Sequence, residues 1–168
     1  SDFWAEPAVQ LVPKAWKKDV NNTEKMCSDV YDFTKESIQK FKDAGANIGM
    51  VQVGNEITNG LLGIYSNRDK GESFNVIWGD KKKSTEVNKY LKAGIKAVRE
   101  YTPQALVALH LETPNVWKYK TIMNTWKRDN VDYDVLGSSY YPFWSIAAKA
   151  NTPKTLKDVQ TLAASYGK

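Results

Sequence analysis

The residues best suited to chemistry lie in the stretch GMVQVGNEITNGLL, residues 49–62, where an apolar run ends in Gly54-Asn55-Glu56. A carboxylate at the end of a buried strand costs free energy unless it is paired, hydrogen-bonded or used. Glu56 could therefore act as a catalytic acid, or it could cap or brace local structure. Asn55 could bond a substrate hydroxyl, or it could satisfy backbone groups in a turn. The dipeptide alone leaves both alternatives open.

Further polar and aromatic residues follow two other apolar runs: His110 with Glu112, and Tyr140-Tyr141 with Trp144. His110 is the only histidine, and a lone histidine is more often a hydrogen-bonded structural residue than a catalytic one. Glu112 precedes a Thr-Pro pair that resembles a helix start, so we expect it to favour the helix N-terminus electrostatically rather than to act in catalysis. The Trp and Tyr residues suit stacking on sugar rings, although core packing explains them equally well.

Helical and strand patterns alternate along the chain. Apolar residues at helical spacing predict four helices, and the stripe of the first includes Phe33 and Phe41. Asn22-Thr23, Thr113-Pro114 and Thr152-Pro153 are expected helix starts. Strands are expected at residues 48–53, 105–110 and 133–138, and a polar, glycine-containing insertion at 58–83.

These strands are apolar throughout, as if buried on both faces, which predicts parallel pairing through right-handed crossovers. Functional residues gathered at the C-terminal ends of successive parallel strands are typical of a (β/α)8 barrel, which needs about 250 residues. With three clear strands in 168 residues, the chain is expected to be one α/β domain, residues 1–168. It would form the central portion of a TIM barrel, truncated at both ends.

Composition excludes several other classes. The net charge of +5 comes from Lys and Arg spread along the chain, so a solvated surface is favoured over nucleic-acid binding. No apolar run approaches the ~20 residues of a membrane span, and no glycine-rich phosphate loop follows a strand. The single cysteine fits no metal-ligand pattern, so no metal or cofactor is expected. The chain contains no signal peptide, and it begins at Ser1 rather than Met, so an upstream segment could be missing.

Five segments, in order and across most of the chain, resemble glycoside hydrolase family 53, the endo-β-1,4-galactanases. They are SDFWAEP (1–7), PKAW (13–16), IGMVQVGNEITNGLL (48–62), VALH (107–110) and DYDVLGSSYYPFW (132–144). The resemblance implies a (β/α)8 barrel whose fourth, fifth and sixth strands are the three predicted here. It also implies a secreted enzyme that hydrolyses β-1,4-galactan, in the (arabino)galactan side chains of pectin, with retention of configuration.

The resemblance further implies roles for individual residues. Glu56 would be the general acid/base, and Asn55 would bond the sugar 2-hydroxyl. His110 matches an active-site histidine of the family, and Tyr141 matches a tyrosine whose hydroxyl could orient the nucleophile. Packing remains an alternative for Tyr141 and for the tryptophans. The positions that match the family's substrate groove are Asp2, Trp4 and Trp144.

A retaining glycosidase needs a second carboxylate as nucleophile. In the family this residue lies a short way after a Tyr-Gly-Lys such as Tyr166-Gly167-Lys168, so the isolated chain is expected to be inactive. Two alternatives stay open, a related β-1,4-glycanase and a non-catalytic sugar-binding half-barrel. An incomplete barrel would also leave strand edges unpaired, which predicts self-association.

Overall fold

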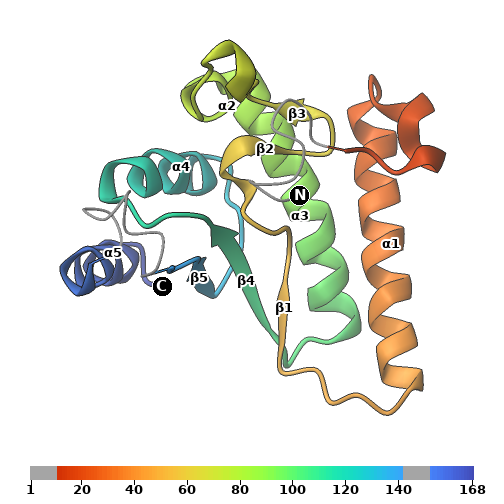
Figure 1. Ribbon diagram of the computed structural model, residues 1–168. Helices are drawn as coiled ribbons and strands as arrows, with labels where there is room; N and C mark the ends of the chain where they lie inside the picture. The colour runs from red at the N-terminus through yellow and green to blue at the C-terminus, as the bar shows by residue number, and fades with distance from the viewer. Residues whose placement is uncertain (1–10, 142–151) are drawn as a thin grey trace.

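The computed structural model describes residues 11–141 and 152–168. At its centre is a parallel sheet of three strands in the order β1–β4–β5, with Val51 opposite Val107 and His110 opposite Gly137. Figure 1 shows α1 and α3 side by side next to β1, and α4 and α5 nearer β5. The strands are β1 (Met50–Gln52), β2 (Gly60–Leu61), β3 (Ile64–Tyr65), β4 (Leu106–Leu111) and β5 (Val135–Ser138). The α-helices are α1 (Thr23–Asp43), α2 (Asn75–Trp78), α3 (Lys81–Tyr101), α4 (Val116–Arg128) and α5 (Pro153–Ser165). Short 3-10 turns occupy Lys14–Asp19, Ile57–Asn59 and Arg68–Lys70.

Two of the expected helix starts are confirmed and one is wrong. The Asn22 side chain accepts a hydrogen bond from the backbone of Lys25 at the start of α1, and Thr152 caps α5 with a proline in its first turn. Helix α4, however, does not begin at Thr113-Pro114. Its cap is Asn115, which has extended backbone angles and accepts from the Lys118 N–H at 2.9 Å. Asn115 is therefore the residue that satisfies a free N–H of the first turn.

The core lies between the sheet and its helices. Strand β4 contributes Val107 and Leu109, which are fully buried, and α3 contributes Leu91 and Val98. Trp126 of α4 is also fully buried. Its ring meets two other aromatic rings edge to face, a favourable arrangement that fixes α4 against the core; these rings are Trp78 and Tyr133.

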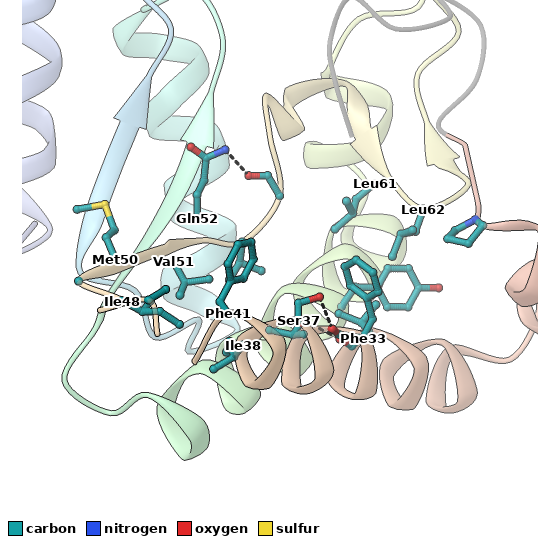
Figure 2. Close-up of a pocket in the computed structure, with 18 of the residues that line it drawn as sticks. Phe33, Ser37, Ile38, Phe41, Ile48, Met50, Val51, Gln52, Leu61 and Leu62 are labelled. Carbon is teal, nitrogen blue, oxygen red and sulfur yellow. Dashed lines mark hydrogen bonds between the residues drawn. The ribbon is translucent and has the colours of Figure 1, made fainter. Parts of the chain in front are cut away.

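Strand β1 is not buried on both faces, which corrects the prediction from its sequence. Met50 is 49% exposed, and Phe33 and Phe41 of α1 are each 63% exposed. Among the described strands, β1 pairs only with β4, so its other edge and the adjoining face of α1 are open. Figure 2 shows this apolar groove, a pocket of about 640 Å³ between α1 and β1. We use the name apolar groove for the surface formed by Phe33, Ile38, Phe41, Met50 and Val51.

The segment 58–83 is more ordered than its polar composition suggests. It forms the antiparallel hairpin β2–β3 and the short helix α2, and it contributes Ile77 and Trp78 to the core. Trp78 Nε1 donates to the Thr58 carbonyl oxygen at 2.8 Å. At Gly60, where φ is +111°, an added Cβ would lie 1.9 Å from the Ile64 carbonyl oxygen, so only glycine fits. The insertion therefore extends the core next to the end of β1.

None of the helices in residues 11–141 and 152–168 combines the length and apolarity that a membrane crossing requires.

Candidate active site

Glu56 lies in a sharp turn directly after β1. Its backbone is left-handed, with φ 46° and ψ 50°, a conformation that costs a non-glycine residue about 1–3 kcal/mol and is enriched at functional sites. Gly54 precedes it with φ +82°, and a Cβ there would come within 2.6 Å of Ile57 Cγ2. Because Ile57 is fully buried, it anchors the chain after the turn. The turn leaves Glu56 only 3% exposed at the C-terminal edge of the sheet.

Three successive strands bring the partners of Glu56 together. Ser139, the residue after β5, donates from Oγ to Glu56 Oε1 at 2.5 Å. His110 of β4 lies with Nε2 3.0 Å from the same Ser139 oxygen, and the Glu56 backbone N–H donates to His110 Nδ1 at 3.2 Å. Asn55 Oδ1 is 3.0 Å from His110 Nδ1. We call Asn55, Glu56, His110 and Ser139 the Glu56 cluster.

The structure thus brings together three of the residues singled out from the sequence: Asn55, Glu56 and His110. Asn55 Oδ1 also accepts from Gln52 Nε2 at 3.0 Å, so its side chain is tied both to β1 and to the cluster. Tyr141 follows β5 by three residues and is 50% exposed, so its ring is not part of the core. The other predicted groove residues, Asp2, Trp4 and Trp144, lie outside the described residues.

Glu112 has a different environment from the one predicted. It is 3% exposed and forms an ion pair with Lys118, a residue in the first turn of α4 whose Nζ is 2.5 Å from Oε1. The same Nζ donates to the Glu112 carbonyl oxygen at 2.9 Å. Burial raises the pKa of the Glu112 carboxyl, and the Lys118 ammonium opposes that shift. Because it is committed to Lys118, Glu112 is a structural carboxylate.

A second hydroxyl next to Ser139 faces a different partner. Ser138 Oγ hydrogen-bonds with the Tyr119 hydroxyl at 2.8 Å, and that hydroxyl also donates to the Leu111 carbonyl oxygen. Side chains alternate in direction along a strand, so consecutive serines reach opposite sides. Ser138 therefore braces β5 against α4, while Ser139 contacts Glu56 and His110.

Sequence reasoning missed Ser139 and Gly137. The signal that could have found them is the register, because Gly137 pairs with His110 and Ser139 follows two residues later on the same side. A Cβ at Gly137 would lie 3.1 Å from His110 Cδ2, tighter than ordinary van der Waals contact. Gly137 thus leaves room for the imidazole ring, which in turn lies within reach of Ser139.

The cluster has the composition of a proton-transfer site. A carboxyl group held by a hydroxyl and placed beside an imidazole can deliver a proton and later take one back. Within residues 11–141 and 152–168, no group of three or more His, Cys, Asp and Glu side chains is arranged to hold a metal ion. The described geometry suits acid–base chemistry by a carboxyl group.

Comparison with known proteins identifies relatives that are named as galactanases. The endo-β-1,4-galactanase of Bacillus subtilis (strain 168) is 41% identical over 169 residues, covering 100% of this chain and 34% of that protein. The arabinogalactan endo-β-1,4-galactanase of Humicola insolens is 29% identical over 176 residues, covering 100% of this chain and 47% of that protein. The chain therefore spans about a third to a half of the length of these curated relatives.

Solved structures agree with the sequence relatives. The family 53 catalytic domain of Ignisphaera aggregans superposes with a TM-score of 0.66 at 29% identity, covering 84% of this chain and 35% of that one. A structure of fungal β-1,4-galactanases gives a TM-score of 0.70 at 27% identity, covering 98% of this chain and 46% of that one. The fold is thus part of a (β/α)8 barrel, as the sequence predicted. The model of glycosyl hydrolase family 53 matches residues 1–168, and the chain belongs to that family.

Proposed function

We propose that the protein containing this chain hydrolyses β-1,4-galactosidic bonds in the (arabino)galactan side chains of pectin. The names of its family relatives support this substrate. The observation that carries the proposal is the position of Glu56, a carboxyl group 3% exposed at the C-terminal edge of the sheet and bonded to Ser139. This edge is where the catalytic residues of (β/α)8 barrels gather.

In the proposed reaction Glu56 acts twice. It first donates a proton to the glycosidic oxygen as the bond to the leaving sugar breaks, and it then removes a proton from the water that releases the bound galactosyl group. A retaining enzyme needs a nucleophilic carboxylate ~5–5.5 Å from this acid/base. Because the chain spans 34% and 47% of these family relatives and the family resemblance puts the nucleophile in a later strand, we place it in a barrel segment outside residues 1–168. The isolated chain should therefore be inactive.

The remaining sequence predictions belong to the same proposal. Asn55 would bond a sugar hydroxyl, and the contact of its Oδ1 with His110 Nδ1 at 3.0 Å would hold its side chain. Tyr141, half exposed beyond β5, would orient the nucleophile through its hydroxyl. The proposed sugar-binding residues outside the described ranges are Asp2, Trp4 and Trp144. Because galactan is a polymer found outside cells, the proposal includes secretion.

A hybrid enzyme tests the function. In it, residues 1–168 replace the matching segment of the Bacillus subtilis relative, which supplies the rest of the barrel. We expect the hybrid to cleave β-1,4-galactan in preference to β-1,4-linked mannan, xylan and glucan. Cleavage of one of these other glycans instead would favour a related glycanase. Galactan binding without cleavage would favour a non-catalytic half-barrel.

Two variants of the hybrid test the role of Glu56. Glu56→Gln should lower kcat on galactan by about 10²–10⁴-fold, the usual contribution of a general acid/base. The matched control is Glu36→Gln, which makes the same change on the exposed surface of α1 and should leave the rate unchanged. Wild-type activity in Glu56→Gln would refute the assignment.

A further inference from the structure

Ser139 joins two groups of the Glu56 cluster that the proposed function uses separately. Its hydroxyl oxygen lies 2.5 Å from Glu56 Oε1 and 3.0 Å from His110 Nε2. A hydroxyl has one proton, so it can donate to only one of these two neighbours. The direction of the bond therefore depends on whether His110 Nε2 carries a proton.

The contacts of the other ring nitrogen, His110 Nδ1, bear on whether Nε2 carries a proton. The Glu56 backbone N–H, which can only donate, points to His110 Nδ1 at 3.2 Å, so a neutral imidazole that accepts this bond carries its proton on Nε2. When the ring is doubly protonated, Nδ1–H can donate to Asn55 Oδ1 at 3.0 Å, and Nε2 again carries a proton. In both of these states Nε2–H donates to Ser139, and Ser139 donates its own proton to Glu56 Oε1. A third state, a neutral ring that donates from Nδ1–H to Asn55 Oδ1, would lose the hydrogen bond from the Glu56 N–H.

The backbone fixes Ser139 in this position. Its N–H donates to the Leu111 carbonyl oxygen at 3.0 Å, and the residue is 8% exposed. Gly137, two residues earlier, leaves the space that the His110 ring occupies. The hydroxyl thus lies between His110 of β4 and Glu56 of the turn after β1.

We propose that Ser139 is a positioning residue for Glu56: its hydroxyl, oriented by His110 Nε2–H, keeps Oε1 as a hydrogen-bond acceptor and so places the acid proton on Oε2. A proton on Oε1 would compete with the Ser139 proton for the same short contact. Its meaning for catalysis rests on the proposed function, whereas the direction of the hydrogen bonds does not. The two can therefore fail separately.

The single histidine makes the test direct. We would label the chain with ¹⁵N-histidine and record imidazole ¹H–¹⁵N spectra near neutral pH, where one set of signals reports His110 alone. The expected spectrum shows a protonated Nε2 with an Nε2–H signal protected from exchange with water. Ser139→Ala should abolish this protection, and Ser138→Ala, which removes the neighbouring hydroxyl bonded to Tyr119, should preserve it.

Three results would overturn the inference: a neutral ring protonated on Nδ1, a ring that averages between both tautomers, or a Ser139→Ala spectrum identical to wild type. If Ser139→Ala does not fold, Ser139→Cys replaces it, since a thiol of similar size donates and accepts more weakly and should reduce the protection. The wild-type tautomer decides the direction of the bonds without any variant. An inactive hybrid would count against the proposed function and leave this measurement unaffected.

Discussion

The Glu56 cluster and the apolar groove meet at β1. In the cluster, other residues of the chain supply hydrogen-bond partners, whereas in the groove much of the apolar surface is left exposed. In the cluster, β1, β4 and β5 each supply a partner, and the Glu56 side chain is almost fully buried. In the groove, Phe33 and Phe41 are largely exposed beside an edge of β1 that no other described strand pairs with. The chain thus holds the partners for its polar chemistry but leaves part of its apolar surface open.

The difference follows from the physics of the two kinds of contact. A buried polar atom without a hydrogen bond costs roughly 1–3 kcal/mol, so partners must lie close by and in fixed directions. Apolar surface needs only to be covered, and any segment of suitable shape can cover it. In a closed barrel each strand pairs on both sides, so a further barrel strand would cover the free edge of β1.

The largest effect on stability is expected from breaking the buried ion pair between Glu112 and Lys118. Lys118→Met should destabilise the chain by about 3–5 kcal/mol, because it leaves the Glu112 carboxylate buried without its counter-ion. The double variant Glu112→Leu/Lys118→Met should recover most of that loss, since no charge remains. Urea unfolding measures both. A single variant as stable as wild type would show that this pair is not a constraint on the fold.

A smaller effect is expected from the hydroxyl that positions Glu56. In the hybrid, Ser139→Ala should lower kcat on galactan by about 10–100-fold, as loss of a supporting contact commonly does, with little change in KM. On an aryl β-galactobioside with a dinitrophenol leaving group, the loss should be smaller because this group departs without protonation. The control is Ser138→Ala. Equal losses on both substrates would indicate general structural damage instead.

The sequence predicted the parallel sheet of three strands, and it placed Glu56 and His110 at the carboxyl ends of β1 and β4. Long apolar stripes placed α1 and α3, and Thr152-Pro153 marked the start of α5, because these signals are local. Glu56 and His110 were found because each is a conspicuous polar residue at the end of an apolar run. Their mutual contact also followed, because parallel strands end at one edge of the sheet.

The failures share a different cause: they concern contacts that no local sequence pattern reports. Ser139 is 83 residues from Glu56, and no local pattern distinguishes it from Ser138. The sequence around Glu112 resembles a helix start, and it gives no sign of the ion pair with Lys118. The exposure of Phe33 depends on what lies beside β1, which helical periodicity in α1 does not report.

The smallest effect on stability is expected in the apolar groove. We propose that the isolated chain self-associates through this surface, each copy covering the groove of another. Phe33→Ser/Phe41→Ser should change the free energy of unfolding by less than about 1 kcal/mol per site, since both rings are largely exposed, but it should shift the chain towards monomer in sedimentation. Trp117→Ser on α4, 61% exposed, is the control and should leave the association unchanged. A wild-type chain that sediments as a monomer would contradict the proposal.

The most direct test of Glu56 as the acid/base is chemical rescue of the Glu56→Ala hybrid. With an activated aryl β-galactobioside, the first step needs no acid, but the second step lacks the base that deprotonates water. Azide is already an anion and needs no base. We expect azide to accelerate Glu56→Ala and to yield a β-galactobiosyl azide, whereas Glu36→Ala should show no acceleration. No response to azide, or an α-configured product, would contradict it.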